Sequence, residues 1–296
     1  MSGDGLRFAK YHGTGNDFVM IEDLEDRMAL TPVLVADLCD RHRGVGADGV
    51  IRIARSDSAD FFMDYWNADG QIAEMCGNGV RCLAKYAYDR GLTARTELNV
   101  GTRAGPKHLV LTVEEGAVAG VRVDMGRPSF ERRAIPMAGP EEETFVGRPF
   151  SDDGREYTAT ALSMGNPHLV LFGVDDLGSL DLRLAGPRLE HHPDFPERTN
   201  VEFVNVRDGV VEVRVWERGS GATMACGTGA CASLVAATLS GFVDRRATVR
   251  FPGGDLDVEW ADDDRVYLTG PATPVFDGEV DAAWVQERLG AREARS

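Results

Sequence analysis

Lysine is scarce in this chain of 296 residues, where Lys10, Lys85 and Lys107 are the only three. Pyridoxal phosphate is held through a Schiff base to a lysine, and no motif in the sequence marks any of the three for that role. Basic charge as a whole is also scarce, because 48 acidic residues against 32 lysines and arginines give a formal net charge of -16. Nucleic acid is therefore not expected as a partner, since phosphate binding requires a basic surface.

Long apolar runs are absent as well. No segment approaches the roughly 18 apolar residues of a membrane-spanning helix, and no apolar core of a secretion signal follows the first residues. We therefore expect a cytoplasmic protein without a membrane partner. With 43% hydrophobic residues the chain can bury a sizeable core, and its length suggests two domains.

The five cysteines form neither a framework for disulfides nor a pattern for zinc. Their number is odd, and no Cys-x-x-Cys occurs. Cys39, Cys82 and Cys231 are expected to be small buried hydrophobes. Cys76 and Cys226 differ from them because they lie in a repeated motif.

The two halves of the chain repeat at a single register. Four landmarks of the first half recur about 150 residues later. Gly15-Asn16, Cys76-Gly77, Gly79 and Gly91 become Gly165-Asn166, Cys226-Gly227, Gly229 and Gly241. Four spaced matches at one offset indicate two similar lobes.

Each lobe has the same predicted plan of strands around one central helix. Strands are expected at 6–12, 18–22, 49–54 and 59–66, at 157–164, 168–174, 200–206 and 210–217, and within the closing segments 95–124 and 247–270. The central helices are expected from Cys76 to Gly91 and from Gly227 to Ser240, and Thr31-Pro32 opens a shorter one. The fold class is therefore α+β, with two pseudo-symmetric lobes.

The division into lobes follows from the repeat. We expect an N-terminal lobe over residues 1–128 that carries Cys76, a C-terminal lobe over 129–280 that carries Cys226, and a tail over 281–296 with a helical pattern. The connection 126–143 is rich in glycine, proline and charge, and is expected to be the least structured part.

The strings MCGNGVRC and ACGTGACA each place a cysteine just before a Gly-x-Gly turn that opens a helix. Backbone amides at a helix start are unpaired and carry the positive end of the helix dipole, so they favour a thiolate and can bind a carboxylate. Two such helix starts facing one substrate would supply a base on one side of a carbon and an acid on the other. Inverting a stereocentre requires that arrangement.

Polar residues suited to an amino-acid substrate accompany the cysteines. Asn16 and Asn166 occupy matching places in the repeat, and Asn67 and Asn200 flank the other expected site strands. Glu217 and Arg218 precede the second cysteine, where they could bind an ammonium and a carboxylate. His168 follows the second Gly-Asn and could tune a thiol.

The ordered strings HGTGNDF, NADGQIAEMCGNGVRC, SMGNPHLV, ERTNVEF and WERGSGATMACGTGACA together resemble diaminopimelate epimerase, from about residue 6 to about residue 277. The resemblance implies a cytoplasmic homodimer that interconverts LL- and meso-diaminopimelate for lysine and peptidoglycan synthesis, without pyridoxal phosphate or metal. It also implies that each lobe is a strongly curved antiparallel or mixed sheet wrapped round its helix. The strand near 266–276 is then expected to return to the first lobe.

The resemblance also implies roles for single residues. The catalytic thiols fall on Cys76 and Cys226, the adjustment of their pKa values on His168 and Glu217, and a dimer contact on Phe276. The substrate contacts fall on Asn16, Asn67, Gly77, Asn78, Asn166, Asn200, Glu217, Arg218, Gly227 and Thr228. Two positions depart from the family pattern, since many members have Gln where this chain has Gly49 and Glu where it has Ala222.

Three other functions fit part of this pattern. A proline or hydroxyproline racemase would use the same two thiols, but its substrate would not need a distal grip by Asn166, Asn200 and Arg218. A redox protein would cycle its cysteines between thiol and disulfide and leave the asparagines unexplained. A binding module would bind diaminopimelate without exchanging its α-proton.

Overall fold

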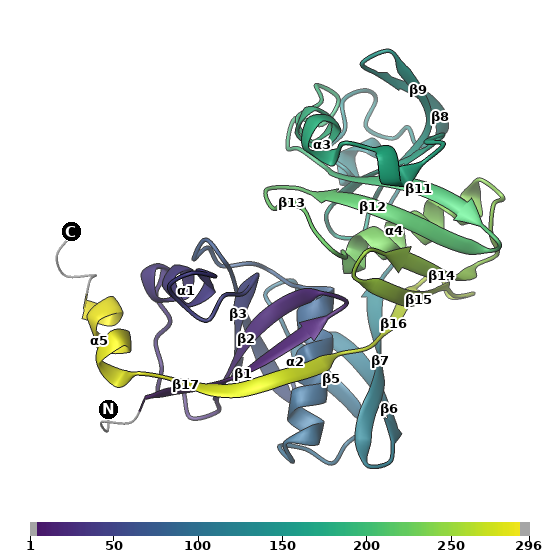
Figure 1. The fold of residues 1–296 in the computed structure, drawn as a ribbon. Helices are drawn as coiled ribbons and strands as arrows, with labels where there is room; N and C mark the ends of the chain where they lie inside the picture. The colour runs from purple at the N-terminus through teal and green to yellow at the C-terminus, as the bar shows by residue number, and fades with distance from the viewer. Residues whose placement is uncertain (1–4, 291–296) are drawn as a thin grey trace. The chain divides into compact units, whose positions relative to one another are not determined.

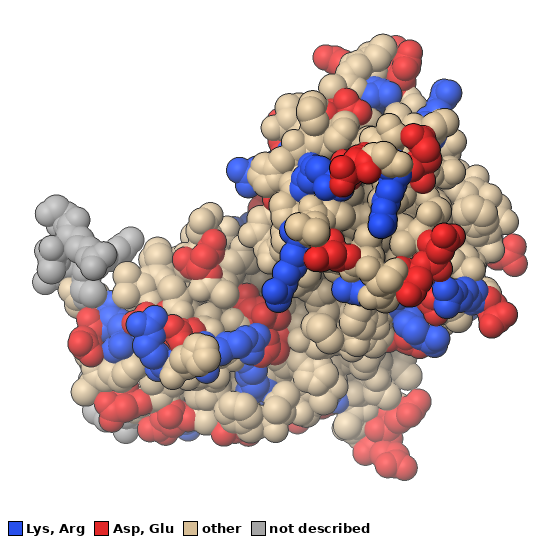
Figure 2. Space-filling model, turned by 45° about the horizontal axis from the view of Figure 1, so that its top comes forward, with Lys and Arg blue, Asp and Glu red and all other residues tan. Residues whose placement is uncertain are grey.

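A computed structural model describes residues 5–290 of the chain. Its contacts divide the chain into two units, drawn in Figure 1. Unit 1 comprises Met1–Val123 and Pro271–Ser296, and unit 2 comprises Asp124–Gly270. Among the described residues, no helix has the length and apolar character needed to cross a membrane. On the face drawn in Figure 2, acidic and basic side chains are interspersed.

Unit 1 is a mixed sheet packed against helix α2 (Gly77–Asp89). Its strands are, in order of pairing, β17 (Thr273–Val280), β1 (Leu6–Gly13), β2 (Asn16–Asp23), β3 (Gly49–Ala54), β4 (Phe61–Asn67), β5 (Glu97–Gly101), β6 (Lys107–Glu114) and β7 (Ala117–Gly126). The β2–β3 and β4–β5 pairs are parallel and the others are antiparallel. Helix α2 contacts β1, β2, β3, β4 and β6, so it is the central helix of the unit.

Two shorter helices complete unit 1. Helix α1 (Pro32–Cys39) begins as the sequence predicts, because Thr31 caps it by accepting the Leu34 N–H at 3.2 Å and Pro32 occupies its first turn. Helix α5 (Ala282–Gly290) packs beside α1. The rest of the expected tail, residues 291–296, lies outside the described residues, as do residues 1–4.

Unit 2 has the same plan around helix α4 (Gly227–Leu239). Its strands are, in order of pairing, β8 (Phe145–Asp152), β9 (Arg155–Ser163), β10 (Pro167–Phe172), β11 (Asn200–Arg207), β12 (Val210–Glu217), β14 (Arg246–Phe251), β15 (Gly254–Trp260) and β16 (Val266–Gly270), with the two-residue β13 (Gly221–Ala222) beside β12. The β10–β11 and β12–β14 pairs are parallel, which matches the two parallel pairs of unit 1. The predicted α+β class with two similar lobes is confirmed.

The repeat extends to the way the chain leaves each unit. After β7 the chain enters unit 2 and adds β8 to the free side of β9, and after β16 it returns to unit 1 and adds β17 to the same side of β1. The outermost strand of unit 2, β8, thus directly follows the unit 1 segment of the chain, and the outermost strand of unit 1, β17, directly follows the unit 2 segment. This exchange places Phe276 in unit 1.

The structure corrects the sequence analysis at two places. The connection 126–143 is ordered around the short helix η1 (Arg132–Ala134), because Ile135 and Met137 are buried in the core of unit 2. Helix α3 (Leu182–Glu190) was not expected, since it contains Gly186 and Pro187. Glycine is required there because a Cβ at position 186 would lie 2.2 Å from the Trp216 ring.

Candidate active site

Cys76 is the N-cap residue of α2. Its backbone is extended (φ -138°, ψ 119°), and its Sγ accepts the N–H of Gly79 at 3.4 Å. Gly77 and Asn78, the first two residues of the helix, follow it directly. Their amides belong to the first turn, where backbone N–H groups have no acceptor within the helix and point outward. A half-buried thiol and a group of anion-binding donors therefore occur together at this helix start.

Cys226 occupies the same place on α4. Its backbone is again extended (φ -127°, ψ 122°), and its Sγ accepts the N–H of Gly229 at 3.3 Å. Gly227 and Thr228 are the first two helical residues. Cys39, Cys82 and Cys231 are buried in the two units, as expected for cysteines of the core.

A tight hairpin delivers Asn16 to Cys76. Thr14 and Gly15 both have positive φ angles, 50° and 84°, and link β1 to β2 with only two residues. The Oδ1 atom of Asn16 then lies 3.6 Å from Cys76 Sγ and accepts a hydrogen bond from the side-chain Nδ2 of Asn78 at 3.2 Å. Asn16 thus presents a carbonyl oxygen to the thiol.

Asn67 ends β4 directly opposite Gly49 of β3. A Cβ at position 49 would lie 2.6 Å from the Trp66 carbonyl oxygen and 2.7 Å from Cε2 of Tyr65. Packing therefore requires glycine at this position, and the Gln of many family members would need strand β4 to shift. Gly49 has no side chain, so it cannot make the substrate contact that the family's Gln makes.

In unit 2 a hydrogen-bonded chain leads from the core to Cys226. The buried His168 lies 2.7 Å from Glu202 through Nδ1 and 2.9 Å from Asn166 Oδ1 through Nε2. Asn166 donates its amide N–H to Thr228 Oγ1 at 3.3 Å, and this hydroxyl lies 3.4 Å from Cys226 Sγ. Because Thr228 accepts from Asn166, its own hydrogen is available to the sulfur.

Glu202 was missed by the sequence analysis. It is fully buried on β11, and its Oε2 atom has no hydrogen-bond partner among the described residues. The available signal was an acidic residue at an inward position of the apolar strand NVEFVNV.

Glu217 ends β12 next to Cys226 and accepts a hydrogen bond from the Thr223 hydroxyl. Burial raises the pKa of Glu217. Burial also raises the pKa of Cys226 well above its ordinary value, and the charges of Glu217 and Glu202 raise it further. The Gly229 amide at the helix start lowers the pKa of Cys226, as the sequence analysis expects, but burial and the two acidic neighbours outweigh this effect.

Asn200 and Arg218 are joined to each other. The Asn200 side chain donates to the Pro167 carbonyl at 2.7 Å and accepts the Arg218 backbone N–H at 2.9 Å. The Arg218 guanidinium reaches the Glu197 carbonyl at 3.3 Å. Asn200 thus fixes the backbone from which Arg218 extends. Ala222 is exposed on β13 opposite Trp216 and makes no part of this network.

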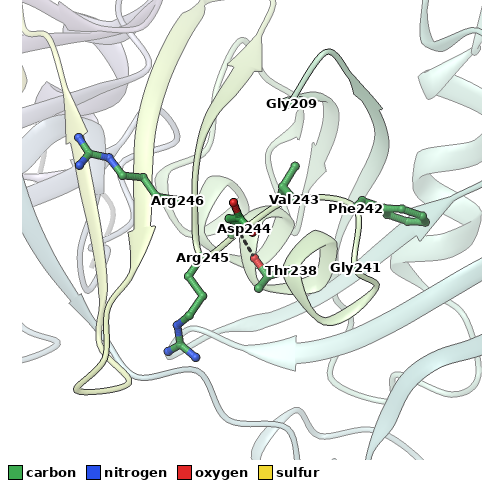
Figure 3. A pocket seen from close by; sticks show the side chains of 8 residues that line it. All are labelled: Gly209, Thr238, Gly241, Phe242, Val243, Asp244, Arg245 and Arg246. Carbon is green, nitrogen blue, oxygen red and sulfur yellow. Dashed lines mark hydrogen bonds between the residues drawn. The ribbon is translucent and has the colours of Figure 1, made fainter.

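A separate hollow of about 620 Å³ lies at the C-terminal end of α4, far along that helix from Cys226 (Figure 3). The Thr238 hydroxyl donates to the Asp244 carbonyl there at 3.0 Å. Arg245 is committed to the carbonyls of Trp260 and Ala261. None of the residues to which the sequence analysis gave a catalytic or substrate-binding role lines this hollow.

Comparison with known proteins identifies the family. A family model described as diaminopimelate epimerase matches residues 8–131 and 160–275, which is well over half of the chain. The chain belongs to the diaminopimelate epimerase family.

Curated members of the diaminopimelate epimerase family align with nearly the whole chain. The diaminopimelate epimerase of Pelotomaculum thermopropionicum is 50% identical over 277 residues, covering 93% of this chain and 98% of its own. That of Acetivibrio thermocellus is 47% identical over 278 residues, covering 93% and 99%. That of Methanococcus maripaludis is 44% identical over 278 residues, covering 93% and 100%.

Solved structures show the same fold at much lower identity. A probable proline racemase from Agrobacterium radiobacter has a TM-score of 0.67 at 16% identity and covers 93% of this chain and 92% of its own. A hydroxyproline epimerase from Agrobacterium vitis has a TM-score of 0.68 at 16% identity and covers 94% and 93%. At such identities the likeness concerns the fold alone.

A pH dependence follows from the burial of Glu217. A raised pKa means that the folded protein binds this proton more tightly than the unfolded chain does. The resulting stabilisation is fully present below the ordinary glutamate pKa and is lost as pH rises through the higher folded value. We expect Glu217→Gln to gain free energy of unfolding relative to wild type over that pH window, measured by urea unfolding.

Glu212→Gln is the matched control, since Glu212 lies on the same strand, is only half-buried and pairs with Arg207 at 3.7 Å. The difference in free energy of unfolding between Glu212→Gln and wild type should change much less with pH. A difference in free energy of unfolding between Glu217→Gln and wild type that stays constant across the window would show that burial does not raise the pKa of Glu217.

Proposed function

We propose that this chain epimerises diaminopimelate, interconverting the LL and meso forms by moving the proton of one α-carbon between two thiols. The observation that carries the proposal is the pair of cysteine-capped helix starts, Cys76 on α2 and Cys226 on α4, each with two following amides and an asparagine beside it. Family membership supports diaminopimelate as the substrate.

The proposed reaction needs one thiolate and one thiol at a time. The thiolate takes the α-proton on one face, and the thiol on the opposite face returns a proton to the same carbon, which inverts it. The reverse reaction exchanges the two roles. Because the buried Cys226 favours its thiol form, we propose that it supplies the proton when the cycle begins from the empty enzyme.

The proposal extends to the contacts with the substrate. We propose that the α-carboxylate binds the amides of Gly77, Asn78, Gly227 and Thr228. Asn16 and Asn67 from unit 1, and Asn166, Asn200, Glu217 and Arg218 from unit 2, bind the ammonium and distal carboxylate groups. The Asn200–Arg218 bond supports this proposal, because it holds Arg218 on a defined backbone.

We propose that the reaction uses neither pyridoxal phosphate nor a metal ion. Lys10 is paired with Asp17 at 2.6 Å, and Lys85 donates to the Val118 carbonyl and pairs with Asp89 at 2.7 Å. Both amines are thus already engaged by neighbouring oxygen atoms, whereas a Schiff-base lysine must be free to bond to the cofactor. The two thiols already supply both proton transfers.

We also propose a cytoplasmic homodimer that assembles through β17. This strand pairs only with β1 among the described strands, and Phe276 is 49% exposed while its ring packs against Phe8 at 5.9 Å. An open strand edge beside an exposed aromatic side chain is suited to a second copy. Sedimentation of the wild-type protein and of Phe276→Asp tests the dimer. The free thiols of Cys39 and Cys82 support the proposed cytoplasmic location.

The function is tested by incubating the purified protein with LL-diaminopimelate in heavy water, with no added cofactor. We expect meso product that carries deuterium at one α-carbon. L-Proline and trans-4-hydroxy-L-proline serve as comparison substrates and should remain unchanged. Binding of diaminopimelate without deuterium exchange, or turnover of the cyclic imino acids instead, would overturn the proposal.

A further inference from the structure

We propose that Asp48 is a positioning residue of the epimerisation site, which acts by orienting the side-chain amide of Asn16 towards Cys76. The inference rests on the proposed function, because it gives Asn16 a place at the reacting thiol. Asp48 is not among the residues to which the sequence or the family resemblance gave a role.

The contact between the two side chains is direct. Asn16 donates its amide N–H to Asp48 Oδ2 at 2.7 Å. A carboxylate only accepts, so the Asn16 NH₂ group must face Asp48 and the Asn16 carbonyl must face the other way. The carbonyl then meets Cys76 Sγ and the Asn78 amide, at 3.6 and 3.2 Å.

The carboxylate of Asp48 is itself held in place. Its Oδ1 atom accepts from Arg41 at 2.9 Å, and its Oδ2 atom also accepts the Asp17 backbone N–H at 3.2 Å. Arg41 binds Asp17 through two further hydrogen bonds, and Lys10 also pairs with Asp17, at 2.6 Å. These cations hold the pKa of Asp17 well below its usual range, although burial alone would raise it. Asp48 is therefore held by a network of ion pairs and hydrogen bonds rather than by a single bond.

The backbone of Asp48 reaches a second asparagine of the site. Its carbonyl accepts, at 3.1 Å, the N–H of Ala68, which is the residue after Asn67. Asp48 also precedes Gly49, which pairs with Asn67 across β3 and β4. One residue thus orients Asn16 through its side chain and fixes the turn after Asn67 through its main chain.

Unit 2 holds its corresponding asparagine the opposite way round. There His168 engages the carbonyl oxygen of Asn166, so the amide N–H of Asn166 faces the thiol side through Thr228. The counterparts of the two orienting residues do not match, since Phe18 stands where unit 2 has His168 and Arg198 where unit 1 has Asp48. The repeat therefore keeps the asparagine but not its support, and Cys76 faces an acceptor while Cys226 faces a donor.

The test is a double-mutant cycle of Asp48→Ala, Asn16→Ala and both together, with two readouts. The first is kcat and KM for diaminopimelate. The second is the rate of iodoacetamide alkylation of Cys76 across pH, followed on its own peptide, which does not require turnover. Asp40→Ala is the matched control, because Asp40 lies in the same segment, binds Arg43 at 2.6 Å and does not contact Asn16.

We expect Asp48→Ala to lower kcat/KM by roughly 10-fold or more, the usual effect of losing a hydrogen bond to a charged group. Adding it to Asn16→Ala should cost little further, because both changes remove the same carbonyl from the thiol. Both should speed Cys76 alkylation at a given pH, and the double variant should match Asn16→Ala. Asp48→Asn, which keeps the shape and one acceptor, should fall between wild type and Asp48→Ala.

Fully additive losses with wild-type alkylation would show that Asp48 only stabilises the fold, and an Asp40→Ala effect equal to that of Asp48→Ala would show the same. If Asp48→Ala does not fold, Asp48→Asn in the same cycle decides. A wild-type protein that does not turn over diaminopimelate would overturn the proposed function alone, since the alkylation cycle still reports the coupling of Asp48 to Cys76.

Discussion

Replacing Cys76 or Cys226 with alanine is expected to lower epimerisation by at least roughly 10²- to 10⁴-fold, the range for loss of a positioned acid or base. Either change removes one of two groups that act in every turnover, so neither direction of the reaction should survive. Folding should be retained, because Gly77 and Gly227 still begin their helices and the change deletes little volume. The measurement is the rate of meso product formation from LL-diaminopimelate, with far-UV circular dichroism as the check on folding.

Cys82→Ala and Cys231→Ala are the matched controls, because each cysteine lies one to two turns further along the same helix and is completely buried. They should cost some stability but leave turnover near the wild-type rate. A Cys76 or Cys226 variant that kept more than about a hundredth of wild-type turnover would contradict the two-thiol mechanism.

Replacing Arg81 with methionine is expected to cause the largest loss of stability from one change in unit 1, about 3 to 5 kcal/mol in the free energy of unfolding. Arg81 is fully buried on α2. Its guanidinium donates to the carbonyls of Gly77 and Pro271 and to the Thr14 hydroxyl, at 3.1, 3.2 and 3.4 Å. Methionine fills similar space but leaves these acceptors buried without their donor.

The expected loss is measured by urea unfolding. Arg90→Met serves as the control, since Arg90 caps the end of the same helix but is 38% exposed and pairs with Asp277. An exposed pair of this kind contributes roughly 0 to 1 kcal/mol. Equal losses from the two variants would mean that the three contacts of Arg81 contribute no more than a surface ion pair.

Local sequence was sufficient for the elements that carry the thiols. A cysteine before Gly-x-Gly predicts a helix start, and the repeat at one offset predicts two of them, so Cys76 and Cys226 were selected with the residues that follow them. The same reasoning selected Thr31 as the cap of α1. The caps depend on neighbours within four residues and the repeat can be read directly from the residue order, which is why the sequence alone predicts them.

Residues that act through distant partners were not found in this way. Asp48 acts on Asn16, 32 residues earlier, and Glu202 acts on His168, 34 residues earlier. No local rule connects such pairs, because strand pairing in the folded sheet brings them together. Helix α3 escaped prediction for a related reason, since Gly186 reflects contact with the distant Trp216 ring rather than a turn.

The electrostatic surroundings of the two thiols could not be predicted from the sequence. The sequence by itself determined the repeated cysteine caps, the family and the set of polar residues around them. Only the tertiary structure decided that Cys226 is buried beside Glu217 and Glu202, which raises its pKa, while Cys76 faces the carbonyl of Asn16. A helix start acts on a thiol through its own first turn, whereas burial and neighbouring charge come from side chains that only the packed fold brings to the sulfur.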